Sequence, residues 1–171
     1  MMADMEITTR DNHGFAVSYV PLGMDAAVSW GSLDFCFKNN TNFPIRIDAK
    51  AEGGTTTVAL MGTDQKDYYV ELRYEVLATY SYDTIYENHT PDNAQGYKQG
   101  DVIMEPHTGY SIQTYRCKYD KETKELIEDK KEAASYYSKS DKVVCQISGS
   151  SESGSQGIGN GGVTESDGIL P

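Results

Sequence analysis

The sequence predicts an all-β fold, an elongated meander of antiparallel sheets in two small modules, and three observations support this prediction. The runs LDFCFKN (33–39) and FPIRIDAKA (43–51) alternate apolar and polar residues with the period of two that is typical of half-buried strands. Clusters of turn-forming residues separate such runs. A third run, YYVELRYEVLATYSY (68–82), keeps its apolar residues on one parity for longer than a helix would.

The first module shows its elements in order. Residues 2–9 fit either the end of a helix or a strand, and a polar turn over 10–14 leads into the strand FAVSYV. Pro21 ends that strand. After the two alternating runs, which we expect to bury Phe43 and its same-face neighbours, Gly53-Gly54 is typical of a two-residue hairpin turn into TTTVALMG.

The second module begins with the long strand at 68–82. An Asn-, Pro- and Gly-rich loop (87–100) precedes the strand SIQTYRCKY. The next piece, LIEDKKEAASYY (126–137), has a composition that favours a helix, but its hairpin context favours a strand, which is the prediction adopted. KVVCQI then closes the sheet. The tail (149–171) is rich in Gly and Ser with few apolar residues, and this composition predicts a flexible, disordered segment.

Composition excludes several functions. A net charge of −11 and a pI near 4.6, with no basic segment, argue against nucleic acid as a partner, because phosphate backbones require a basic surface. The sequence has no apolar run of the ~18 residues that a membrane-spanning helix needs. Its first residues also lack the basic-then-apolar pattern of a signal peptide. We expect no nucleic-acid binding, no membrane insertion and no export element within this chain.

Several recognisable motifs follow one another in the first third of the chain. A Tyr-Val-Pro run starting at Tyr19 leads into GMDAAVSW, followed by LDFCFKNNTNFPIRI and a hairpin that ends on VALMG. These motifs, in this order, resemble the VanW family. The remainder is similar to the five-glycine-repeat domains that often follow VanW domains, through YSYDTIYEN, YKQGDVIMEPHTGYSIQTYRCKYD and VVCQI. The resemblance implies three segments: the C-terminal part of a VanW-like domain (1–63), a five-glycine-repeat-like β domain (64–148) and the tail (149–171).

The resemblance also implies a bacterial cell-wall protein outside the membrane, associated with peptidoglycan cross-linking of the L,D-transpeptidase type. Arg10 and His13 match an Arg-x-x-His of the family, which makes His13 the candidate base of this chemistry. The family nucleophile is a cysteine in a Gly-Gly-x-Cys-Gln segment, and this chain contains no such segment. We therefore expect the chain to be inactive alone, whether or not its parent is an enzyme.

Each candidate site residue also has a structural interpretation. His13 is either the base or a turn histidine that caps and packs. Asp25, in GMDAAV, either orients His13 as the third group of a catalytic site or satisfies turn amides, and the sequence favours the second. Tyr80 and Tyr82 either stack against sugar rings, as in a non-catalytic wall-binding or spacer module, or cover a thin core.

We expect no cofactor and no metal. His89 and His107, with acidic residues between them, are either loop histidines or a zinc pair. Of the three cysteines, Cys117 and Cys145 either pair or act as apolar fillers. The chain itself is interpreted as a fragment of an extracytoplasmic protein, with an intact cytoplasmic protein as the alternative. A fragment would expose apolar surface, so self-association is a further expectation.

Overall fold

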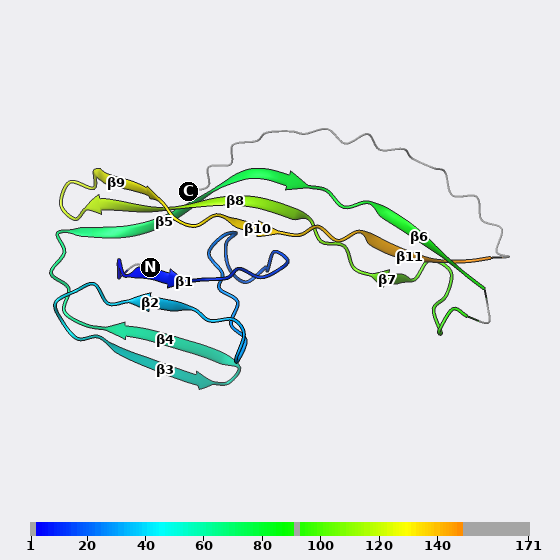
Figure 1. Ribbon diagram of the computed structural model, residues 1–171, viewed down its shortest axis with the longest axis horizontal. Coiled ribbons are helices and arrows are strands. Elements are labelled where there is room, and N and C mark those ends of the chain that lie inside the picture. Colours follow the sequence, from blue (N-terminus) through cyan, green and yellow to red (C-terminus); the bar gives the residue numbers. More distant parts are fainter. Residues whose placement is uncertain (1–2, 91–92, 149–171) are drawn as a thin grey trace. The chain divides into compact units, whose positions relative to one another are not determined.

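The computed structural model describes residues 3–90 and 93–148, and every regular element within these ranges is a β-strand (Figure 1). The predicted all-β fold is confirmed, and 126–137 forms strands rather than a helix. Within the same ranges there is no helix that could cross a membrane. The predicted flexible tail (149–171) lies outside the described residues.

Two antiparallel pairs form in the first third of the chain. Residues 2–9, ambiguous in the sequence, contain strand β1 (Glu6–Thr9), which pairs with β2 (Cys36–Lys38). Strands β3 (Arg46–Glu52) and β4 (Thr55–Met61) form the predicted hairpin and lie side by side in Figure 1. Its two turn residues, Gly53 and Gly54, have φ of 57° and 77°, the left-handed values that favour glycine in such a turn.

The central sheet has four strands. Its order is β10 (Ser135–Tyr137), β8 (Gly109–Asp120) and β5 (Tyr68–Tyr80), and β9 (Leu126–Lys131) also pairs with β8. Both β9 and β10 pair antiparallel with β8, at different parts of that long strand. This pairing explains why a sequence with good helix formers becomes a strand, because ladder hydrogen bonds override a weak local propensity.

A three-stranded sheet departs from the antiparallel expectation. Strand β11 (Lys142–Ile147) lies between β6 (Thr84–His89) and β7 (Val102–Met104). It pairs antiparallel with β7 but parallel with β6, from Lys142 opposite Thr84 to Ile147 opposite His89. A parallel pair needs a long connection, and here the chain forms β7 to β10 between the two paired strands.

Contacts divide the chain into two compact units that interleave in sequence. Unit 1 comprises Met1–Asp11, Ala26–Tyr74 and Thr114–Ala133, and unit 2 comprises Asn12–Asp25, Glu75–Gln113 and Ala134–Pro171. The contact-based division therefore differs from a single cut near residue 63, and the predicted 1–63 and 64–148 domains stay a prediction.

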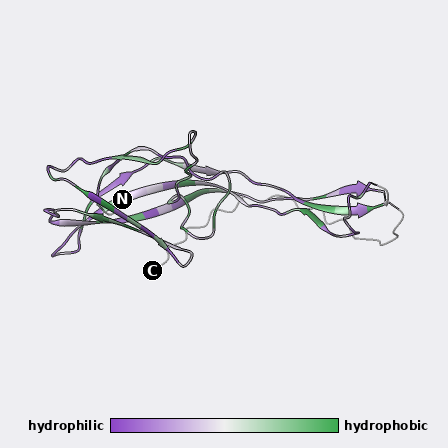
Figure 2. Cartoon of the chain, turned by 90° about the horizontal axis from the view of Figure 1, so that it is seen from below, coloured by the Kyte–Doolittle hydropathy of each residue, from purple (hydrophilic) through white to green (hydrophobic). Residues whose placement is uncertain are grey.

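The apolar core of each unit is small. The buried apolar residues are Met5, Ala27, Val70, Tyr115 and Cys117 in unit 1, and Ala94, Ile112, Tyr137 and Cys145 in unit 2. Figure 2 shows polar and apolar residues mixed along the strands. Cys117 and Cys145 are free thiols in different units, so the structure contains them as buried fillers rather than as a disulfide.

The prediction that one face of the hairpin is buried is wrong in part. Phe43 and Ile45 are half-buried, but Ile47 is 54% exposed and every residue of β3 is exposed. The alternation correctly predicts a strand, but it cannot show whether a second layer covers the apolar face.

Candidate functional site: an aspartate–histidine pair in unit 2

A stretch of extended chain places His13 beside strand β10. The side-chain amide of Asn12 donates a hydrogen bond of 2.8 Å to the carbonyl oxygen of Tyr136, and the backbone N–H of Ser138 donates one of 2.8 Å to the carbonyl oxygen of Gly14. These two contacts flank His13 on this segment and Tyr137 on β10, so they bring the two residues close together.

A tight turn at residues 21–24 positions Asp25 beside His13. The backbone N–H of Met24 bonds to the carbonyl oxygen of Pro21 at 3.1 Å, and Gly23 has a φ of 76°. A positive φ at the third position is the mark of a type II turn and requires glycine or asparagine there. The family-like Pro-x-Gly-x-Asp spacing therefore has a geometric reason: the turn aims Asp25 back at His13.

Asp25 is the most buried charged group of the site, with 4% of its surface exposed. Its Oδ2 atom accepts a hydrogen bond from the backbone N–H of His13 at 2.7 Å and lies 2.8 Å from His13 Nδ1. Its Oδ1 atom accepts a hydrogen bond from the hydroxyl of Tyr137. Burial alone would raise the pKa of Asp25, but the hydrogen bonds from Tyr137 and His13 outweigh it and hold the pKa below 3.8.

An ionised Asp25 fixes the tautomer of His13. A carboxylate only accepts hydrogen bonds, so Nδ1 carries a proton and donates it to Asp25. In the neutral ring Nε2 is then the free basic nitrogen, and the hydroxyl of Tyr19 lies 3.3 Å from it. The His13 side chain is 34% exposed and Tyr19 is 75% exposed, so Nε2 faces solvent rather than the core. The arrangement suits a general base held by a carboxylate.

The structure brings two of the three predicted catalytic residues together. His13 and Asp25 contact each other. Arg10 follows β1 and is half-buried. Sequence reasoning missed Tyr19 and Tyr137. Tyr19 stands in the Tyr-Val-Pro run close to His13, so proximity could have found it, but Tyr137 is 112 residues from Asp25 and only the fold reveals it.

The predicted carbohydrate-binding tyrosines lie at and beyond the end of β5. Tyr80 is 40% exposed and its ring contacts that of Tyr136, with centroids 5.9 Å apart. Tyr82 is 43% exposed and follows the strand. Tyr136, which the sequence did not single out, is 58% exposed and extends the aromatic surface.

The other histidines have ordinary surroundings. His107 stacks on Phe15 with ring centroids 4.4 Å apart, and Nε2 of His89 lies 3.1 Å from a carboxylate oxygen of Glu87. Within residues 3–90 and 93–148, no three His, Cys, Asp or Glu side chains are grouped so that they could hold a metal ion.

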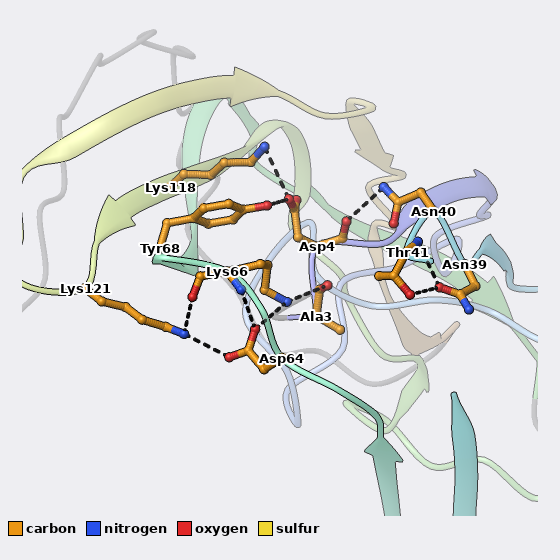
Figure 3. A network of polar contacts seen from close by, with 10 residues as sticks. All are labelled: Ala3, Asp4, Asn39, Asn40, Thr41, Asp64, Lys66, Tyr68, Lys118 and Lys121. Carbon is orange, nitrogen blue, oxygen red and sulfur yellow. Dashed lines mark hydrogen bonds and ion pairs between the residues drawn. The ribbon is translucent and has the colours of Figure 1, made fainter. Parts of the chain in front are cut away.

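A second polar cluster, in unit 1, surrounds Asp4 (Figure 3). Its carboxylate accepts hydrogen bonds from the Tyr68 hydroxyl at 2.6 Å and from Arg116 Nη1 at 3.0 Å, and Lys118 Nζ lies 3.2 Å away. Burial would raise the pKa of Asp4, but these three partners together lower it. Arg116 is 5% exposed and also pairs with Glu132. The cluster ties the start of the chain to β5 and β8, and its charges are paired among themselves.

Comparison with known proteins assigns the first third of the chain. A family model described as "VanW like protein" matches residues 1–61. The uncharacterized protein YoaR of Bacillus subtilis is 47% identical over 62 residues, which are 36% of this chain and 20% of YoaR. Residues 1–61 are therefore a VanW-like segment, and the resemblance predicted from the sequence is confirmed for this part of the chain. The chain spans about a fifth of the length of this relative.

A solved structure titled "IgA1 Protease G5 domain structure" resembles part of the chain. The match covers 49% of this chain and 95% of that one, at 16% identity and a TM-score of 0.29. A TM-score this low does not establish a shared fold, so the five-glycine-repeat likeness of residues 64–148 stays a prediction.

Proposed function

We propose that this chain is part of an extracytoplasmic bacterial cell-wall protein that contacts peptidoglycan and contributes the basic half of a thiol-dependent site. The observation that carries the proposal is the contact between His13 and the buried Asp25. A buried carboxylate that accepts a hydrogen bond from Nδ1–H leaves Nε2 free to take a proton. It also stabilises the imidazolium that then forms. The VanW-like segment that contains both residues supports the assignment to the cell wall.

In this chemistry the chain's own role is proton transfer. His13 Nε2 takes the proton of a thiol, the thiolate attacks a peptide carbonyl, and the imidazolium returns the proton to the leaving amine. None of the three cysteines suits the nucleophile's role. Burial raises the pKa of both Cys117 and Cys145, which disfavours a thiolate, and Cys36, in β2, lacks the Gly-Gly-x-Cys-Gln surroundings of the family nucleophile. The proposed thiol therefore comes from another segment of the parent, of the L,D-transpeptidase type, and this chain is inactive alone.

A second candidate function is non-catalytic binding to wall polymers. The exposed rings of Tyr80 and Tyr136 contact each other, and aromatic rings of this kind stack against the apolar faces of sugars. Tyr82 adds a third exposed ring from the same part of the chain. This function needs neither His13 nor a nucleophile.

Sedimentation with purified peptidoglycan separates the two candidates. If the tyrosines bind the wall polymer, the chain pellets with it, and Tyr80→Ala and Tyr82→Ala each reduce the pelleted fraction whereas His13→Ala does not. If the chain contacts the wall mainly through the histidine site, His13→Ala reduces pelleting and the tyrosine variants do not. A chain that stays in the supernatant contradicts wall binding by this part of the protein.

A further inference from the structure

Tyr137 has a buried hydroxyl with two partners in the histidine site. The residue is 1% exposed, and its hydroxyl donates a hydrogen bond to Asp25 Oδ1. The same oxygen accepts a hydrogen bond of 2.8 Å from the backbone N–H of Gly23. Phenylalanine would fill the same apolar space, so the hydroxyl has a role that packing alone does not explain.

Two contacts with β10 and the residue after it bring this hydroxyl and His13 to the same carboxylate. The Asn12 side chain bonds to the carbonyl oxygen of Tyr136, and the backbone N–H of Ser138 bonds to the carbonyl oxygen of Gly14. His13 contacts Oδ2 and Tyr137 contacts Oδ1. The two side chains hold Asp25 between them and leave it one orientation.

We infer that Tyr137 is a positioning residue of the His13–Asp25 site, although it lies outside the VanW-like segment. It fixes the turn through Gly23 and the carboxylate through Oδ1, so that Oδ2 points at His13 Nδ1 and Nε2 remains the basic nitrogen. Strand β10 is thus part of the site, and the segment after the VanW-like match completes it rather than serving as a spacer. Only the role of His13 as a base rests on the proposed function; the orientation itself does not.

Removal of the hydroxyl isolates its effect. In Tyr137→Phe the amide of Gly23 and Oδ1 of Asp25 each lose their hydrogen bond with this hydroxyl, and the loss of a buried hydrogen bond is costly. The matched control is Tyr136→Phe, which removes a hydroxyl from the next residue of the same strand, on the opposite, exposed face. Both variants are made in the full chain and compared by ¹⁵N nuclear magnetic resonance.

Two readouts are expected to change in Tyr137→Phe and not in Tyr136→Phe. The amide hydrogen of Gly23 exchanges faster by about tenfold or more, as loss of a hydrogen bond predicts. The neutral His13 ring, held in the Nδ1–H form in the unmodified chain, becomes a mixture of the two tautomers. Asp25→Ala is the second variant: it removes the acceptor of the Nδ1 proton, so it shifts the ring toward the Nε2–H form while Tyr137 stays in place.

The outcomes are distinguishable from those of wall binding. An unchanged His13 tautomer in a folded Tyr137→Phe chain overturns the inference, whatever the peptidoglycan sedimentation shows. If Tyr137→Phe does not fold, Asp25→Ala decides: a ring that keeps the Nδ1–H form there shows that Asp25 does not set the tautomer, and the inference fails. A mixture in Tyr137→Phe with no wall binding supports the inference and contradicts the proposed function.

Discussion

At the scale of single residues, the described part of the chain buries charged side chains at two sites: Asp25 in unit 2, and Arg116 with its partner Asp4 in unit 1. Both carboxylates have a pKa below the ordinary value because hydrogen-bond donors surround them. A buried charge is tolerated only when its partners are in place, so removal of one partner exposes the cost. The two sites therefore make separate predictions about stability.

The pH dependence of stability reports on Asp25. Its pKa is depressed in the folded chain, so its contribution to stability is fully present above pH 3.8, the ordinary value, and is lost as the pH falls through the folded pKa. Urea unfolding from pH 7 down to acid should show that the stability difference between the unmodified chain and Asp25→Asn shrinks in this acid range. The same substitution at exposed Asp34 controls for lost charge. A constant difference at every pH contradicts an ionised, hydrogen-bonded Asp25.

Two arginine substitutions test the unit 1 cluster: one at buried Arg116 and a control at exposed Arg46. Arg116→Ala leaves Asp4 and Glu132 without their buried partner and should cost about 3 kcal/mol in the free energy of unfolding. Arg46→Ala breaks a pair whose side chains are 71% and 49% exposed and should cost under about 1 kcal/mol. Chemical denaturation measures both, and equal costs would show that the cluster is not buried in solution.

At the scale of elements, the sequence predicts where strands form better than it predicts which strands pair. The alternation of the hairpin run, the Gly53-Gly54 turn and the long β5 run were all predicted, because each depends on neighbours a few residues away. The parallel pairing of β6 with β11 and the contact of Tyr137 with Asp25 were not, because they join residues far apart in sequence. In the sequence, the pairing of His13 with Asp25 was the less favoured of two interpretations of Asp25, and its geometry came from the structure.

A glycine at the start of β8 tests whether β10 positions the site. A Cβ atom on Gly109 would lie 2.9 Å from the carbonyl oxygen of Tyr137 and 2.7 Å from the backbone nitrogen of Lys139, closer than real Cβ contacts. Gly109→Ala should therefore displace β10 and destabilise the chain by about 1–3 kcal/mol. It should also shift the resonances of His13.

Gly14→Ala is the control for this substitution. A Cβ atom there meets nothing within 4 Å, although Gly14 borders the same strand. This variant should leave both stability and the His13 resonances close to those of the unmodified chain. Equal effects of the two substitutions would contradict the close approach of β8 to β10.

At the scale of the whole molecule, each of the two units contains residues from within the VanW-like segment (1–61) and residues from beyond it. Unit 1 includes Thr114–Ala133 from beyond it, and unit 2 includes Asn12–Asp25 from within it. The VanW-like segment and the rest of the chain therefore both contribute to each unit. Among the described residues each unit buries few apolar side chains, as is typical of small units.

We expect self-association of the chain to occur through the exposed apolar face of the β3–β4 hairpin. Ile47 pairs across the hairpin with Leu60, and both are exposed, as is Val58 two residues along. Analytical ultracentrifugation at increasing concentration should show association that Ile47→Lys with Val58→Lys abolishes, because charges oppose burial of this face. Thr57→Lys, on the opposite face of the same hairpin, is the control and should not change it. A monomer at all concentrations contradicts this expectation.

In this chain the buried carboxylate of Asp25 holds the ring of His13 in one tautomer. The most direct test is the tautomer of His13 in the unmodified full chain, measured by ¹⁵N nuclear magnetic resonance at alkaline pH, where a free imidazole is neutral. The structure predicts the Nδ1–H form, with Nε2 unprotonated. A dominant Nε2–H form, which free histidine also prefers, would show that Asp25 does not hold the ring and would contradict the account.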